Sequence, residues 1–161
     1  MINVEITGNL PNINTDLEPA MEKIADIMYR SVQQNFISGG RPNQWEPLAH
    51  LGLPSHLYQY QSGFMFENIQ LSWDGTQAKV FIDTARVPYA RINNFGGVIK
   101  HPGSDKFQAF AGADGMVFTH GTKPHDINIP QRKFMMFQEM DKIKILQTLS
   151  NVIFIESGEK I

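Results

Sequence analysis

The chain contains no cysteine. This absence excludes disulfides, cysteine-ligated zinc sites and thiol catalysis, and it is typical of proteins that fold in a reducing compartment. Apolar runs are also short, because none approaches the roughly 18 residues that a membrane-spanning helix needs. The first residues, MINVEITGNLPN, lack the basic segment and apolar core of a signal peptide. We therefore expect a soluble protein that is made in the cytoplasm.

The net charge of the chain is also small. The 14 lysines and arginines are balanced by 16 acidic residues, which gives a formal net charge of −2. Basic residues form no stripe, whereas proteins that read DNA or RNA carry a clustered basic surface. We expect no specific nucleic-acid binding and no membrane binding. A near-neutral surface remains compatible with a channel through which DNA passes with little interaction.

The usual catalytic motifs are missing. The sequence has no GxSxG nucleophile elbow, no GxxxxGK[ST] phosphate loop and no HExxH metal motif. His101, His120 and His125, with Asp126, are the candidates for a metal site, but their spacing matches no ligand pattern on a helix. We predict no catalytic residue, no metal and no cofactor. A small metal-dependent hydrolase is the less favoured alternative.

The first 38 residues carry clear hydrophobic periodicity. The length of 161 residues predicts a single domain over 1–161. Period-two alternation predicts a strand at its start, and a capping box of Thr15 and Glu18 predicts a long helix that ends before Gly39. The apolar stripe of that helix is Leu17, Met21, Ile24, Met28 and Val32.

Residues 37–63 show no sustained period and are rich in glycine, proline, glutamine and aromatic residues. Loops of this length are uncommon in compact domains and are usually functional. Trp45, Tyr58 and Tyr60 are candidates for a protein contact, since interfaces favour aromatic side chains. The alternative is that the loop folds back over the edge of the core.

The second half predicts two hairpins and a helix. One hairpin turns at Asp74-Gly75 and the other at Ala113-Asp114-Gly115. The final helix runs to about Phe154, and a frayed tail follows at 157–161. Its predicted buried stripe is Ile143, Leu146, Leu149 and Ile153. Because strands and helices are segregated, the fold class is α+β, with an antiparallel sheet on which the N-terminal and C-terminal helices pack.

A short helix is predicted within VPYARINNFGGVIKHPG, from Val87 to Asn94. Four apolar side chains fall near helical spacing, and we expect them to pack this helix against the sheet: Val87, Tyr89, Ile92 and Phe95. Gly96 and Gly97 allow the positive φ that ends it. Arg91, Asn93 and Asn94 are then expected to face solvent or a neighbouring subunit.

The segment IPQRKF carries one more candidate. Arg132 could bind a phosphate or a carboxylate, but an arginine after Ile-Pro more often pairs with a buried carboxylate or a carbonyl. We favour this structural role. The residues that we assign to structure are Tyr89, Phe95, Gly96, Gly97, Pro130, Arg132 and Phe134.

Four segments in collinear order resemble the phage virion morphogenesis family, the tail-completion and neck proteins of Mu-type and P2-type tailed phages and prophages. They are FISGGRPNQWEPL, LYQYQSGFMFENIQLSWDGTQAKVFI, YARINNFGGVI and IPQRKFM. The likeness spans about Asp16 to Ile153. The chain departs from the family pattern at Asn93-Asn94, where His-Gln is common, and at Lys133, where a proline is common. A third departure is 59–63, in place of a basic run before the hairpin.

The resemblance implies a structural virion protein that acts in head–tail joining, and it implies no catalysis. Such proteins work as rings, often sixfold, in the neck and tail of the virion, after assembly in the host cytoplasm. The expected partners are therefore other copies of the chain and other neck or tail proteins. Alternatives within the resemblance are a tail terminator and a head–tail adaptor.

A closed ring needs a heterologous interface, in which one face meets a different face of the neighbour. We expect the loop at 39–63 and the hairpin around Asp114 to supply much of it. The contact candidates are Arg41, Trp45, Tyr58, Tyr60, Arg91, Asn93, Asn94 and Asp114.

Overall fold

The computed structural model describes residues 1–7, 16–46, 63–112 and 115–156, and within them all side chains except those of 6–7, 105–120, 122 and 153–156. The elements are, in chain order, β1 (Ile2–Thr7), α1 (Glu18–Ile37), α3 (Phe64–Glu67), β2 (Ile69–Trp73), β3 (Gln77–Ile82), α4 (Ala90–Phe95), β4 (Gly97–His101), β5 (Ser104–Gly112), β6 (Gly115–Thr122), β7 (His125–Ile129) and α5 (Glu139–Glu156). The fold is mixed α+β with antiparallel sheets, as predicted.

A three-stranded antiparallel sheet has the order β1-β3-β2. Its central strand β3 buries Ala78, Val80 and Ile82 on one face, which is the alternation that a half-buried strand shows. The predicted first strand and the hairpin around Asp74-Gly75 are both confirmed. The Asp74 carboxylate accepts the N–H groups of Thr76 (2.7 Å) and Gln77 (2.9 Å), so the turn is held by its own side chain.

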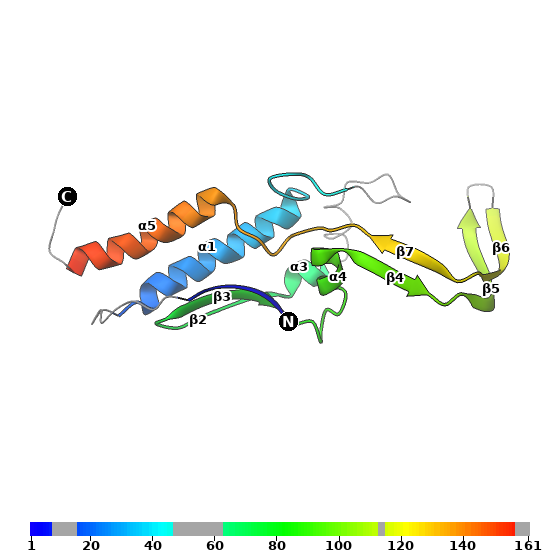
Figure 1. Cartoon of the computed structure of the whole chain (residues 1–161), viewed down its shortest axis with the longest axis horizontal. Coiled ribbons are helices and arrows are strands. Elements are labelled where there is room, and N and C mark those ends of the chain that lie inside the picture. The colour runs from blue at the N-terminus through cyan, green and yellow to red at the C-terminus, as the bar shows by residue number, and fades with distance from the viewer. Residues whose placement is uncertain (8–15, 47–62, 113–114, 157–161) are drawn as a thin grey trace.

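Helix α1 covers one face of this sheet (Figure 1). The predicted apolar stripe is confirmed, because all of its members are buried and the stripe continues to Phe36. At the start of the helix, the N–H of Glu18 donates to the Asp16 carboxylate (3.0 Å). Thr15, the other half of the predicted capping box, lies outside the described residues.

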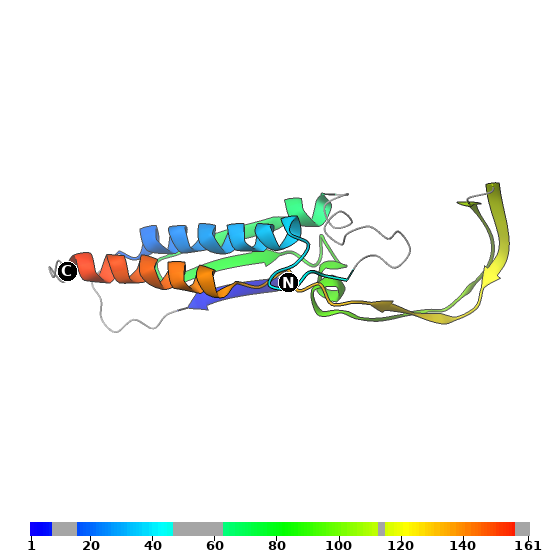
Figure 2. The same cartoon turned by 90° about the horizontal axis from the view of Figure 1, so that it is seen from above.

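Helix α5 runs beside α1 on the same side of the sheet (Figures 1 and 2). The helix itself is confirmed, and so is Leu149 of the predicted stripe, but Ile143 and Leu146 were wrongly placed in it. Ile145 is buried and Leu149 packs against the core, whereas Ile143 and Leu146 are exposed. The cause is Asp141, which bonds to α1 and turns the face of Asp141, Ile145 and Leu149 inward. Ile153 lies outside the described side chains.

Strands β4 to β7 form one long two-stranded ribbon. β4 pairs with β7 and β5 pairs with β6, so the second pair continues the first after a break at His101–Ser104. We call this ribbon, Gly97–Ile129, the arm. It projects from the end of the body where α3 and α4 lie (Figure 1) and bends where β5 begins and β6 ends (Figure 2). The predicted second hairpin is confirmed, and its turn at 113–114 lies outside the described residues.

The corner that leads into the arm agrees with the prediction only in part. The short helix α4 is present, Val87 is fully buried and Arg91 is exposed, as predicted. Four residues are reversed: Asn94 is only 2% exposed and Asn93 is buried, whereas Phe95 is 57% exposed and Tyr89 also faces outward. The Asn94 amide oxygen accepts the N–H of Met135 (3.0 Å), and the Asn93 carbonyl accepts that of Arg132 (2.8 Å). Buried backbone N–H groups need such partners, and at Asn94 the side chain supplies one that a phenyl ring could not.

The glycines at this corner behave as predicted. Gly96 has φ 70° and Gly97 has φ 158°. A Cβ at Gly96 would lie 3.0 Å from the backbone nitrogen of Gln131. The chain therefore passes close to the 129–131 segment as it leaves α4.

Candidate assembly interface

The segment just after α1, residues 39–46, is folded against the core. Gly40 has φ 112°, and a Cβ there would lie 2.6 Å from the carbonyl oxygen of Asn43. Trp45 is buried, its N–H donates to the Gly39 carbonyl (2.7 Å), and its ring meets that of Phe36 edge-on at 6.0 Å. Of the two alternatives for this loop, folding back over the core edge holds for 39–46. Tyr58 and Tyr60 lie outside the described residues.

A buried polar cluster joins this segment to both long helices. We call Ser31, Asn35, Arg41 and Asp141 the Asp141 cluster. The Arg41 guanidinium donates to the Ser31 carbonyl (2.7 Å) and the Asn35 amide oxygen (2.9 Å). The Ser31 hydroxyl donates to Asp141 at 2.5 Å, and Arg41 lies 3.9 Å from the same carboxylate. The head of Arg41 is therefore engaged inside the molecule.

Asn35 extends the cluster to the segment before α5. Its amide nitrogen donates to the carbonyls of Phe134 (2.7 Å) and Met136 (2.9 Å). Phe134 is fully buried, with its ring 4.9 Å from that of Phe36. The 131–136 segment is thus held on both sides, by Asn35 and by Asn94, although it has no regular secondary structure.

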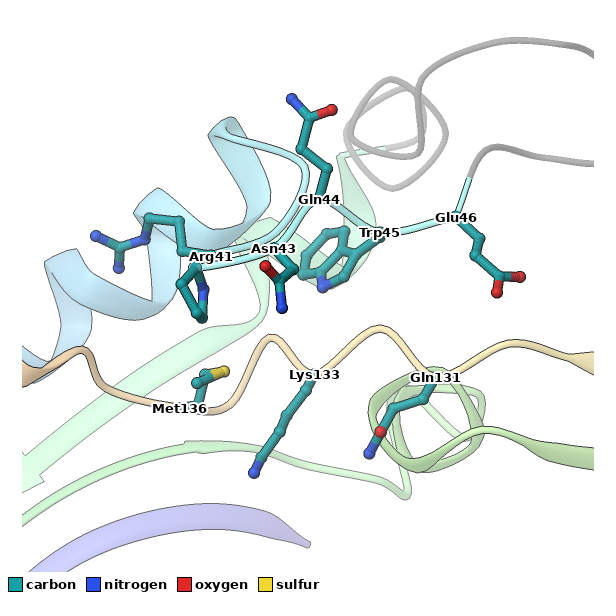
Figure 3. Close-up of a pocket in the computed structure, with 9 residues that line it drawn as sticks. Arg41, Asn43, Gln44, Trp45, Glu46, Gln131, Lys133 and Met136 are labelled. Carbon is teal, nitrogen blue, oxygen red and sulfur yellow. The ribbon is translucent and has the colours of Figure 1, made fainter.

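A shallow hollow of about 270 Å³ lies between residues 41–46 and the 131–136 segment (Figure 3). Trp45 forms its wall on one side, and Gln131, Lys133 and Met136 line the other. No carboxylate pair and no nucleophile beside a base lines it, so its lining suits contact with another surface better than chemistry.

Two histidines at the base of the arm, His101 and His125, pack on each other. The rings of His101 and His125 stack across β4 and β7 at 5.0 Å. Each Nδ1 is occupied locally, by the N–H of Gly103 (3.1 Å) and by the carbonyl of Lys123 (2.9 Å). Within the described residues no three histidine, aspartate or glutamate side chains come together as metal ligands would. The His120 side chain is outside the described set.

Among the carboxyl groups of the described side chains, Asp74 has a shifted pKa. The backbone N–H and the hydroxyl of Thr76 lower the pKa of Asp74 below its usual 3.8. Asp74 sits in the exposed turn between β2 and β3, so this shift reflects turn geometry and not an active site.

Two exposed apolar surfaces stand out among the described residues. One is a row on α5, where Met140, Ile143 and Leu146 are 62%, 45% and 63% exposed. The other is on the arm, where Ile99 is 43% and Ile127 is 36% exposed. Sequence reasoning missed the first because it placed Ile143 and Leu146 in the core. The available signal was that α5 carries more apolar residues than one stripe can hold.

The predicted contact candidates are not gathered into one patch. Arg91 is exposed on α4, whereas Asn93 and Asn94 are buried and Arg41 and Trp45 face inward. Asp114 lies outside the described residues. The residues assigned to structure divide similarly: Phe134 and Arg132 are buried, Pro130 is half-buried, and Tyr89 and Phe95 are exposed.

The model of the phage virion morphogenesis family matches residues 5–153. The chain belongs to this family. The resemblance seen in the sequence is confirmed, and the match includes α1, β2, β3, the arm, the end of β1 and most of α5. Neither the curated proteins nor the solved structures contain a match. Membership of a phage structural-protein family implies a role in tail or virion assembly. Within the described residues, no helix combines the length and apolar character needed to span a membrane.

Proposed function

We propose that this virion morphogenesis protein is a tail-completion protein that acts in the neck, where copies assemble into a ring that joins head and tail. The projecting arm is the observation that carries the proposal. An isolated two-stranded ribbon is marginally stable in water, so an arm of 33 positions, Gly97–Ile129, is built to lie on another protein.

The shape of the molecule suits a ring. The arm leaves one end of the body, while the two long helices occupy the rest of its length (Figure 1). A contact between an arm and the body of the next copy joins two different faces, and such heterologous contacts close into rings. The sixfold symmetry that we propose comes from the family resemblance, since tail tubes of these phages are sixfold.

Electron microscopy of particles made without this protein tests the role. We expect full heads and finished tails that stay unjoined. Overlong tails would instead assign the protein as a tail terminator. Normal tails with heads that have lost their DNA would favour a head–tail adaptor, and normal virions would refute all three roles.

The ring is tested separately on the purified protein. We expect a species of six times the 18.2 kDa chain mass in sedimentation or mass photometry, alone or after addition of tail tubes. A protein that remains monomeric under both conditions would contradict the ring.

A further inference from the structure

The base of the arm is a two-faced ribbon. The register places Gly97 opposite Ile129, Ile99 opposite Ile127, and His101 opposite His125. Directly opposed residues share a face, and successive residues alternate, so these three pairs lie on one side. We call this side the apolar arm face. The other side carries Val98 with Asn128 and Lys100 with Asp126, and it is mostly polar.

Helix α5 has a second apolar side. Met140, Ile143 and Leu146 are spaced by three and form one row, which we call the outer row. The opposite side, with Asp141, Ile145 and Leu149, packs on α1 and the core. A helix that is apolar on both sides is typical of one that is covered on both sides. One chain leaves the outer row uncovered.

The two surfaces lie apart within one copy. The arm extends away from the body, whereas α5 lies along the body beside α1 (Figures 1 and 2). From 97 to 112 the arm spans about 50 Å at 3.3 Å per residue, whereas the 18 residues of α5 span about 27 Å. The arm is thus long enough to cross a neighbouring copy.

We propose that the apolar arm face of one copy packs on the outer row of α5 in the next copy. This inference rests on the ring of the proposed function and names its interface. A second copy is the occupant because each uncovered apolar surface finds its match on the same chain. Once docked, the apolar arm face is buried while Lys100 and Asp126 remain in water.

The area of the apolar arm face can be compared with the area that a specific interface buries. Five strand positions of two strands offer about 17 Å by 10 Å, or about 170 Å², whereas specific interfaces bury about 800 Å² per partner. The β4–β7 face therefore supplies only part of the contact, as the anchor of a larger interface.

The absence of cysteine provides a direct test. Ile127→Cys and Leu146→Cys are made as separate proteins, mixed, and oxidised mildly. We expect disulfide-linked dimers in the mixture and not with either protein alone, because each contact joins one arm to one helix. The matched control is Val98→Cys mixed with Leu146→Cys, since Val98 lies on the polar side of the same strands. It should cross-link several-fold less.

Each other outcome overturns the inference. Cross-linking of Ile127→Cys alone would show arm-to-arm contact, and cross-linking of Leu146→Cys alone would show helix-to-helix contact. Equal cross-linking by Val98→Cys would show no preferred face. A ring that forms without any cross-link refutes the interface and leaves the proposed ring standing, whereas a protein that never oligomerises refutes the ring itself.

A charge substitution gives a second measurement. Leu146 is exposed in one chain, so Leu146→Asp should leave the fold intact and weaken self-association about tenfold or more, measured by sedimentation. Lys144→Asp, at an exposed position off the outer row, is the control and should change it less. Equal association by Leu146→Asp and the unmodified protein would also refute the interface.

Discussion

Replacing Asp141 by alanine should cost more stability than any exposed charge of α5. The carboxylate accepts the Ser31 hydroxyl (2.5 Å) and the N–H of Gln138 (3.0 Å), and it faces Arg41 at 3.9 Å. Asp141 is only 8% exposed, so water does not readily replace these bonds. The substitution removes the hydrogen bond from Ser31 that joins α1 to α5, and it also removes the hydrogen bond from the Gln138 N–H at the start of α5.

The magnitude follows from the bonds that are lost. Hydrogen bonds to a charged group contribute about 1.5–3 kcal/mol each, and two of them are removed. Arg41 keeps its bonds to the Ser31 carbonyl and to Asn35, which limits the loss. We therefore expect the free energy of unfolding to fall by about 3 kcal/mol. For a chain of this length that lowers Tm by roughly 6–12 °C.

Thermal unfolding followed by circular dichroism measures the effect, at a protein concentration where the compared variants have the same assembly state. The control is Glu139→Ala, in the first turn of α5, whose side chain is 82% exposed and forms an ion pair with Lys142. Exposed pairs contribute less than about 1 kcal/mol. If Asp141→Ala lowers Tm no more than Glu139→Ala does, the cluster does not stabilise the fold as argued.

Two further predictions concern glycine geometry and turn electrostatics. Gly40→Ala should lower the free energy of unfolding by about 2 kcal/mol or more, because Gly40 has a positive φ and an added Cβ would lie 2.6 Å from the Asn43 carbonyl oxygen. The control is Gly75→Ala, where an added Cβ would meet nothing within 4 Å, and it should change the free energy by less than about 0.5 kcal/mol. Urea unfolding measures both. An NMR titration should place the pKa of Asp74 below 3.8, and Thr76→Val should raise it, since the hydroxyl is one cause of the shift. Because the folded-state pKa is lowered, the stability contributed by Asp74 is present above pH 3.8 and is lost as the pH falls through the folded-state value. An unchanged pKa in Thr76→Val would contradict this assignment.

Much of the fold was predictable because its signals are local. The alternation of β1, the stripe of α1 and the Asp-Gly turn between β2 and β3 each arise from neighbours within a few positions. The burial of Asn94 has no such signal. Its partner is the N–H of Met135, 41 positions away, and an asparagine before glycines resembles a surface turn in sequence.

The Asp141 cluster could not be predicted from the sequence for the same reason. Ser31 and Asp141 are 110 positions apart, and no periodic pattern relates them. Arg41 and Trp45 were predicted as contact residues because they lie in the long loop, and Trp45 also because aromatic side chains are enriched in interfaces. The same side chains also fill the edge of a core, and only the course of the chain through Gly39 and Gly40 decides between these roles.

The error on α5 bears directly on the proposed interface. Ile143 and Leu146 were assigned to the core because they recur at helical spacing, and a stripe that is buried by a neighbouring copy has the same spacing as one buried within the chain. The structure gives the inner side of α5 to Asp141, Ile145 and Leu149, since Asp141 must reach Ser31. The outer row is then an apolar stripe that the fold leaves unused. If the arm of the next copy covers it, the pattern did indicate burial, and the misassignment concerns only which chain supplies the cover.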